Sequence, residues 1–191
     1  MDHADHVRLL RDGVPREAGT WADLGAGEGA FTLALADLLG PSSRIHAVDR
    51  DADALRALER AYARLAKRRE LATITTVVAD FAHDLALPPL DGVVMANSLH
   101  FVRDKGPVLA RVRGLLKPRG VFLLVEYDTD HGNTWVPYPL SLAAWEILGP
   151  ETGFTETHLI GSQPSRFLGR IYSASSRRAD VPTVRGPRHG T

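Results

Sequence analysis

The chain has 191 residues, 44% of them hydrophobic as in an ordinary globular protein, and its 23 Lys and Arg balance 23 Asp and Glu. This balance creates no strong field toward nucleic acid or anionic lipid, and zero cysteines exclude disulfides, thiolate metal sites and a cysteine nucleophile. No apolar run approaches the roughly 20 residues of a membrane span, and the first residues lack the basic and apolar regions of a signal peptide. We therefore expect a cytoplasmic α/β protein without a membrane partner, and a nucleic-acid partner is disfavoured.

Helices and strands are predicted to alternate through the first two thirds of the chain. The expected elements in chain order are a helix at about 3–12, a strand at 20–24, a helix at 28–39, a strand at 44–48, a helix at 51–68, a strand at 73–78, a strand at 92–96, a helix at 105–116 and a strand at 121–125. The last of these strands reads Val-Phe-Leu-Leu-Val. It is apolar on both faces, which predicts a central position in a sheet.

The pattern changes after the fifth strand. A loop and a short helix at 141–148 are followed by strands at 154–160 and 166–174. Only about five residues separate these two strands, whereas a parallel crossover needs roughly a dozen or more, so the pair must be antiparallel. The sequence thus predicts one domain over 1–174, and residues 175–191 have the composition of a flexible tail.

A glycine-rich turn follows the first strand. Residues 23–29 read Asp-Leu-Gly-Ala-Gly-Glu-Gly, and the second strand ends in Asp49. Such a unit holds a nucleoside-bearing cofactor, because bare glycine backbone lets the ligand approach closely and the acid can bind a ribose diol. Gly25-x-Gly27-x-x-Ala30 also fits a dinucleotide fingerprint, but Asp23 and Glu28 would repel a pyrophosphate at the helix N-terminus. These acids favour a zwitterionic ligand that carries a positive charge.

Two further strand ends carry polar or aromatic residues. The third strand ends in Asp80-Phe81, and the fourth is followed by Asn97-Ser98-Leu99-His100. Together with residues 23–29, which fit the motif I pattern E/D-x-G-x-G-x-G, these segments resemble the class I S-adenosylmethionine-dependent methyltransferases. Residues 115–120, Leu-Leu-Lys-Pro-Arg-Gly, are typical of that family's small-molecule branch. The resemblance covers residues 18–126 and implies a Rossmann-like, doubly wound, mostly parallel seven-stranded sheet with an antiparallel C-terminal hairpin.

The resemblance implies one S-adenosylmethionine site at these strand ends. The three motif I glycines would lie under the methionine moiety, Asp49 would hold the ribose hydroxyls, and Asp80 would accept from the adenine amino group beside Phe81. The expected cofactor-binding residues are Asp23, Gly25, Gly27, Glu28, Gly29, Asp49, Arg50, Asp80, Phe81, Asn97 and Ser98, and no metal is expected. Taken singly, Asp49 also fits a helix-terminal acid and Asp80 a turn cap, so the prediction depends on agreement among four strand ends.

A general base is useful only where the acceptor has a proton to lose. His100 is the favoured catalytic residue, since its segment is expected to border the methyl site, although a structural histidine is equally compatible. Glu126, Asp128 and His131 follow the fifth strand as other candidates. Two aromatic residues of the loop at 126–140 are expected either to wall an acceptor pocket or to pack under the loop: Trp135 and Tyr138.

The nature of the acceptor and of the partner follows from what the sequence lacks. The Asn/Asp-Pro-Pro-Tyr/Phe tetrapeptide of DNA-adenine and glutamine methylating relatives is absent after the fourth strand, which favours a small-molecule acceptor. The chain after the fifth strand is short, so the pocket is either open or completed by a second copy in a homodimer. A donor-binding scaffold or activator without catalysis is the alternative function. A nicotinamide enzyme is disfavoured, because no Tyr-x-x-x-Lys pair is present.

Overall fold

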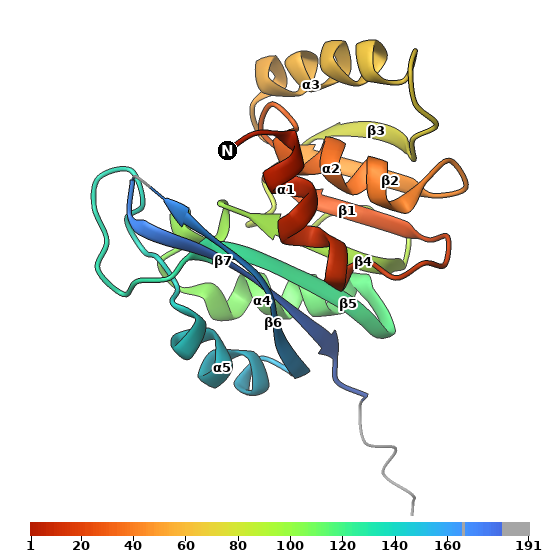
Figure 1. Ribbon diagram of the computed structural model, residues 1–191. Helices are drawn as coiled ribbons and strands as arrows, with labels where there is room; N and C mark the ends of the chain where they lie inside the picture. Colours follow the sequence, from red (N-terminus) through yellow and green to blue (C-terminus); the bar gives the residue numbers. More distant parts are fainter. Residues whose placement is uncertain (166, 181–191) are drawn as a thin grey trace, which may run out of the picture.

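Seven strands form one sheet in the computed structural model, which describes residues 1–165 and 167–180 (Figure 1). They are β1 Thr20–Leu24, β2 Arg44–Asp49, β3 Thr73–Val78, β4 Leu90–Ala96, β5 Leu116–Tyr127, β6 Phe154–Ser165 and β7 Gly169–Arg178. The strand order is β3-β2-β1-β4-β5-β7-β6; the first five strands pair in parallel, and β7 is antiparallel to both β5 and β6. The Rossmann-like sheet with its antiparallel hairpin is confirmed.

The strand order reverses beside β1, which pairs with β2 on one side and β4 on the other. The chain therefore moves toward one edge of the sheet from β1 to β2, and toward the other edge from β4 to β5. In open α/β sheets, ligands bind in the crevice that this reversal opens at the carboxyl ends of the strands. The loops after β1, β2, β3 and β4 are consequently the ones that can meet around a ligand.

Helices cover both faces of the sheet (Figure 1). They are α1 His3–Leu10, α2 Ala30–Leu39, α3 Ala52–Leu65, α4 Lys105–Leu115 and α5 Leu142–Glu151, with 3₁₀ turns η1 Arg11–Gly13 and η2 Leu99–Phe101. Side chains of β5 alternate between two apolar clusters: Leu123 packs with residues of α1 and α2, whereas Phe122 packs with residues of α4 and α5. The central position expected for this strand is confirmed, since it lies buried between β4 and β7.

Polar caps fix where the helices begin after the strand ends. Asp51 accepts the backbone N–H groups of Asp53 and Ala54 at the start of α3, directly after β2. Asp104 accepts from Gly106 at the start of α4, which follows the turn after β4. These carboxylates satisfy helix N–H groups that have no partner within the helix. The caps therefore also set the length of the loops that face the crevice.

The C-terminal hairpin is longer than expected. Strand β6 extends to Ser165 and β7 continues to Arg178, so the paired chain passes the boundary expected at residue 174. Ser176 pairs with Phe122 of β5, and its hydroxyl accepts the indole N–H of Trp145 at 3.2 Å, which holds this part of β7 in the core. The rest of the expected tail, residues 181–191, lies outside the described residues. Between residues 1 and 180, residue 166 excepted, no helix is long and apolar enough to cross a bilayer.

Candidate functional site

A cavity of about 480 Å³ opens at the carboxyl ends of β1 to β4. Its lining residues come from the four loops that follow these strands: Gly25, Gly27, Asp49, Arg50, Asp51, Ala54, Ala79, Asp80, Phe81, Ala82, Asn97, Ser98, Phe101 and Val102. Asp49 and Asp80 therefore face one common space, as the sequence predicted. This volume is within the range of small-ligand sites.

Two glycines line the cavity, and they have different roles there. Gly25 has φ +84°, and a Cβ at this position would lie 2.4 Å from Cβ of Ser98. Gly27 has φ +52°, but its missing Cβ would meet nothing within 4 Å. The Gly27 N–H donates to Oδ2 of Asp49 at 2.7 Å. Gly25 thus permits close packing of the loops after β1 and β4, whereas Gly27 leaves open space above bare backbone.

Three residues expected at the cofactor do not line this cavity. Gly29 begins α2 with φ +90°, and a Cβ there would lie 2.1 Å from Cδ1 of Leu58, so this glycine allows α3 to pack against the loop. Asp23 is buried beneath the loop and accepts the hydroxyl of Thr32 at 2.6 Å. Glu28 is exposed. Some positions of the motif I pattern face the cavity and others pack against the rest of the protein. The spacing of residue types in the sequence does not show which are which.

Burial raises the pKa of Asp23 to about 7; the hydroxyl of Thr32 opposes the shift, and the charge of Asp49 adds to it. Desolvation disfavours the charged form of a carboxyl, and a neighbouring carboxylate acts in the same direction. Asp23 is therefore a carboxyl group beneath the cavity floor whose charge depends on pH near neutrality.

The rim of the cavity has a negative balance of charge. Three carboxylates line it, Asp49, Asp51 and Asp80, against the single guanidinium of Arg50. Each oxygen of Asp49 accepts one backbone N–H, from Gly27 and from Asp51, and retains a second lone pair for a ligand hydroxyl. The arrangement suits a ligand with positive charge and hydroxyl donors, and it opposes a pyrophosphate.

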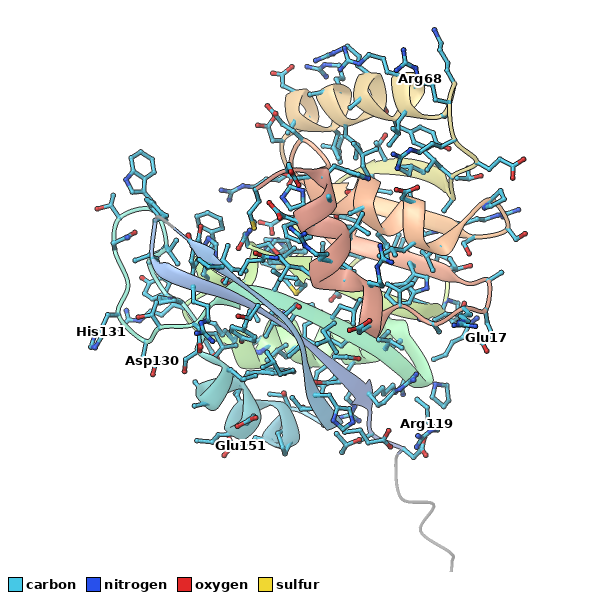
Figure 2. The ribbon with its side chains drawn as sticks, viewed as in Figure 1. Glu17, Arg68, Arg119, Asp130, His131 and Glu151 are labelled. Carbon is cyan, nitrogen blue, oxygen red and sulfur yellow. The ribbon has the colours of Figure 1, made fainter. Side chains whose placement is uncertain are left out.

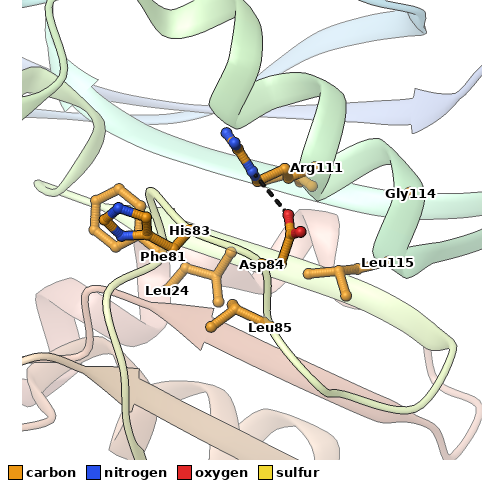
Figure 3. A pocket seen from close by; sticks show the side chains of 9 residues that line it. Leu24, Phe81, His83, Asp84, Leu85, Arg111, Gly114 and Leu115 are labelled. Carbon is orange, nitrogen blue, oxygen red and sulfur yellow. Dashed lines mark hydrogen bonds and ion pairs between the residues drawn. The ribbon is translucent and has the colours of Figure 1, made fainter.

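Asp80 and Phe81 follow β3 at the far side of the cavity. The carboxylate of Asp80 accepts the N–H of Ala82 at 2.8 Å, which turns the loop after β3. Phe81 lines this cavity and also a smaller one of about 250 Å³ on the α4 side (Figure 3). In the smaller cavity Arg111 pairs with Asp84 at 3.1 Å, and both side chains lie near the surface. Phe81 is thus the partition between the two spaces.

The turn after β4 carries an unusual residue. Asn97 has φ +52°, its N–H donates to the carbonyl of Val125, and its Oδ1 is buried without a hydrogen-bond partner among the described residues. Ser98 donates its hydroxyl to the Leu24 carbonyl at 2.7 Å and so ties this turn to the end of β1. A strained residue with an unpaired buried acceptor beside a cavity is a candidate ligand contact.

His100 does not line the cavity but lies next to it. Its ring centroid is 4.3 Å from that of Phe101, which does line the cavity. The side chain is buried, and Nδ1 is 2.8 Å from Oε2 of Glu126, at the carboxyl end of β5. Of the other candidates, Asp128 accepts the backbone N–H of Leu142 at 3.0 Å. His131 is exposed, and Figure 2 shows it projecting outward from the loop after β5.

Trp135 and Tyr138 lie on the loop between β5 and α5 and are both exposed, at 72% and 40%. Neither belongs to the lining of the cavity at the carboxyl ends of β1 to β4. The N–H of Tyr138 donates to the carbonyl of His100 at 3.0 Å, which fixes this loop to the turn after β4. The two aromatic side chains are therefore exposed on a loop that is tied to the turn after β4, and they are not packed in the core.

Sequence reasoning missed several lining residues. Asp51 is the N-cap of α3 and Ala54 lies in its first turn, Ala79 and Ala82 flank the expected Asp80-Phe81 pair, and Phe101 and Val102 follow the expected Asn97 to His100 segment. Their proximity to predicted residues was the available signal. In residues 1–165 and 167–180, no three His, Asp or Glu side chains form a group suited to a metal ion.

Comparisons with known proteins point to one family. A family model described as a methyltransferase domain matches residues 22–122. No curated protein matches the chain. Among solved structures, YcgJ from Bacillus subtilis is 13% identical, with a TM-score of 0.72 over 94% of this chain and 100% of that one. An S-adenosylmethionine-dependent methyltransferase from Aquifex aeolicus is 15% identical, with a TM-score of 0.70 over 92% and 90%.

A third similar structure contains the methyl donor. Magnesium protoporphyrin IX methyltransferase from Synechocystis PCC 6803, with bound S-adenosylmethionine, is 15% identical to this chain. The TM-score is 0.65 over 90% of this chain and 74% of that one. At such identities the likeness establishes the fold, whereas the family model covers more than half of the sequence.

Proposed function

The chain belongs to the methyltransferase domain family, and from this premise we propose that it methylates a small molecule with S-adenosylmethionine held in the cavity after β1 to β4. The observation that carries the proposal is the convergence of Gly27, Asp49 and Asp80 on one space. Agreement among separate strand ends is far less expected by chance than any single motif.

The residues present fit the donor chemically. S-adenosylmethionine carries an ammonium and a sulfonium, which suit the negative balance of the rim, and two ribose hydroxyls, which suit the free lone pairs of Asp49. The unpaired Oδ1 of Asn97 offers an acceptor for a ligand N–H. In the proposed arrangement Asp80 accepts from the adenine amino group, with Phe81 beside the ring. Asp23 and Gly29 support the loop from below.

The cofactor supplies an activated methyl group, so the protein mainly aligns the acceptor and excludes water. Ser98 holds the turn after β4 against β1, which fixes the position of Phe101 at the cavity wall. We propose His100, beside Phe101, as the catalytic residue that accepts a proton from the acceptor. Proximity and orientation supply the larger part of the acceleration, and a positioned base typically adds about 100- to 10,000-fold.

The small-molecule acceptor is supported by the surroundings of the cavity. The tetrapeptide of DNA-adenine and glutamine methylating relatives is absent after β4. Exposed aromatic side chains stand on the adjoining loop and turn, namely Phe101, Trp135 and Tyr138. Aromatic side chains offer large apolar contact at low entropic cost, so a flat or apolar acceptor fits this edge.

Calorimetry with S-adenosylhomocysteine tests the donor site. We expect wild-type protein to bind it and Asp49→Ala to weaken binding about 10- to 100-fold, because charge-assisted hydrogen bonds to the ribose are lost. Asp53→Ala is the matched control: this acid lies nearby in the first turn of α3, but it pairs with Arg56 and does not line the cavity. Unchanged affinity in Asp49→Ala would contradict the assignment.

A methyl-transfer screen with labelled S-adenosylmethionine separates the enzyme from the scaffold. Turnover of one or more small acceptors is expected. Tight binding of S-adenosylhomocysteine without transfer across a broad panel would favour a donor-binding scaffold or activator. Stabilisation by NAD, with none by S-adenosylhomocysteine, would overturn both functions.

A further inference from the structure

Three charged or titratable side chains are buried together beside the donor cavity. His100, Lys105 and Glu126 are 3%, 8% and 0% exposed, and they come from η2, the start of α4 and the end of β5. Buried ionisable groups are costly and are retained where they are paired or used. The proposed function uses His100 but assigns nothing to Glu126.

Glu126 binds His100 twice. Its Oε1 accepts the backbone N–H of His100 at 3.0 Å, and its Oε2 is 2.8 Å from the imidazole Nδ1. The first bond alone would suffice to tie η2 to β5. The second bond fixes the orientation of the imidazole ring. A carboxylate accepts but cannot donate, so this pairing assigns the proton to Nδ1 when Glu126 acts as a carboxylate.

The consequence falls on the other ring nitrogen. With Nδ1 protonated, neutral imidazole has an unprotonated Nε2, which is the nitrogen that can accept a proton. Among residues 1–165 and 167–180, Nε2 makes no hydrogen bond. The centroid of the imidazole ring is 4.3 Å from that of Phe101 and 6.1 Å from that of Tyr127. The ring of His100 is thus held in one orientation, and only the ring of Phe101 is needed to connect it to the cavity wall.

Lys105 completes the local framework without touching the imidazole. Its Nζ donates to the carbonyls of Val102 and Tyr138, at 2.9 and 2.8 Å. It joins the turn after β4 to the loop after β5. Lys105 is therefore a structural tie of the same turn, which makes it a suitable comparison for Glu126.

We propose, on the basis of the proposed function, that Glu126 is a positioning residue that presents Nε2 of His100 as a proton acceptor, and that the acceptor atom therefore carries a dissociable proton, as in a hydroxyl or an activated carbon. The bond between this atom and the methyl carbon forms as the carbon–sulfur bond of the donor breaks with its electron pair going to sulfur. The acceptor's proton goes to Nε2, and the resulting imidazolium is paired with the Glu126 carboxylate. Thiolates, which have no proton to lose, gain nothing from this pair.

Nuclear magnetic resonance of the imidazole nitrogens tests the positioning role without any acceptor. In wild-type protein saturated with S-adenosylhomocysteine, we expect His100 as one tautomer with Nδ1 protonated and Nε2 unprotonated. Glu126→Gln should mix the tautomers, because the amide can donate to Nδ1, whereas Lys105→Met should leave the tautomer unchanged. Protonated Nε2 in wild-type protein, or an unchanged tautomer in Glu126→Gln, would overturn the proposal.

Acceptor probes test the chemical class. Catechol and ethyl acetoacetate carry a hydroxyl and an activated carbon, and thiophenol is the matched acceptor that ionises readily. We expect His100→Asn to reduce kcat for the first two about 100-fold or more and Glu126→Gln about 10- to 100-fold, with KM little changed. Transfer to thiophenol should change by no more than a few-fold. Equal loss for all acceptors would indicate a merely structural role.

The two proposals fail separately. Absence of S-adenosylhomocysteine binding would defeat the donor assignment, whereas the tautomer of His100 can be read in the free protein as well. Glu146→Gln, on the exposed face of α5, serves as the control for the effect of removing one carboxylate. It should leave both the tautomer and the methyl-transfer rates as in wild-type protein.

Discussion

The two edges of the site are built in different ways. Around the donor cavity, the geometry comes from backbone: glycines with positive φ, carboxylates that accept backbone N–H groups, and strand ends that follow each other in the chain. Around His100, the geometry comes from side chains that join distant segments, such as Glu126 and Lys105. A site built from backbone tolerates substitution of most of its side chains, but it does not tolerate substitution of the few glycines that shape it. Side-chain sites depend on each partner.

The largest effect expected at the donor edge is on the pH dependence of stability. The pKa of Asp23 is raised to about 7 by burial, whereas in the unfolded chain it has its ordinary value of 3.8. The folded protein therefore holds this proton up to about pH 7, and the free energy of unfolding falls as pH rises from about 4 to 7. Linkage makes the loss roughly 4 kcal/mol. Asp23→Asn should remove this loss.

Urea unfolding at pH 5, 6, 7 and 8 measures the difference between wild type and Asp23→Asn. The variant should gain stability relative to wild type as pH rises, and the gain should level off above pH 7. Parallel stability curves for the two proteins would show that Asp23 does not titrate in this range. The group beneath the donor cavity would then be an ionised carboxylate throughout this pH range.

The second prediction separates the packing glycine from the ligand-facing glycine. Gly29→Val should lower the free energy of unfolding by about 3 kcal/mol, because the new side chain meets Leu58 and the residue has φ +90°. Gly27→Val, also at positive φ but with nothing within 4 Å, should cost about 1–2 kcal/mol.

Calorimetry with S-adenosylhomocysteine should give the opposite ranking. At matched folded fraction, Gly27→Val should abolish most binding because its side chain occupies ligand space, whereas folded Gly29→Val should retain it. Similar affinity losses in both variants would remove the distinction between the two glycines.

At the other edge, Lys105→Met should cost about 1–2 kcal/mol, since two carbonyls lose their charged donor while the apolar stem is preserved. The free energy of unfolding is expected to fall, and amide hydrogen exchange should accelerate in the loop between β5 and α5. Affinity for S-adenosylhomocysteine should stay within about twofold of wild type. A larger loss of affinity would mean that the two edges are not independent.

The smallest effect is expected at the cavity behind Phe81 (Figure 3). The pair of Arg111 with Asp84 is solvent-exposed, and such pairs contribute about 0–1 kcal/mol. Arg111→Ala should therefore change stability by less than about 1 kcal/mol and leave donor affinity unchanged. A clear loss of affinity in calorimetry would show that this second space takes part in donor binding.

The donor edge is largely predictable from the amino-acid sequence. A strand followed by glycines and an acid has local meaning, because residues adjacent in the chain stay adjacent in space. The residues that are expected at the site and do line the cavity are Gly25, Gly27, Asp49, Arg50, Asp80, Phe81, Asn97 and Ser98. Asp23, Glu28 and Gly29 are expected with them but lie elsewhere, because a motif does not say which side of a loop faces the ligand.

The strand end predicts His100 as a candidate, but the sequence does not reveal what orients its ring. Its partner Glu126 lies at the end of β5, and the sequence offers Glu126, Asp128 and His131 only as alternative bases to His100. Only the pairing of β4 with β5 brings the carboxylate of Glu126 to the imidazole while His131 points outward. Likewise, the short connection predicts the hairpin, but the burial of Ser176 under Trp145 decides that β7 continues to Arg178.

By itself, the sequence determined the order of strands and helices, the antiparallel hairpin and the residues that end each strand, because these depend on local periodicity and on loops too short for other connections. The tertiary structure decided which of those residues meet, which glycine packs and which faces open space, and which carboxyl loses its charge. Contacts and desolvation arise only when segments distant in the chain come together, and no local pattern encodes their distances.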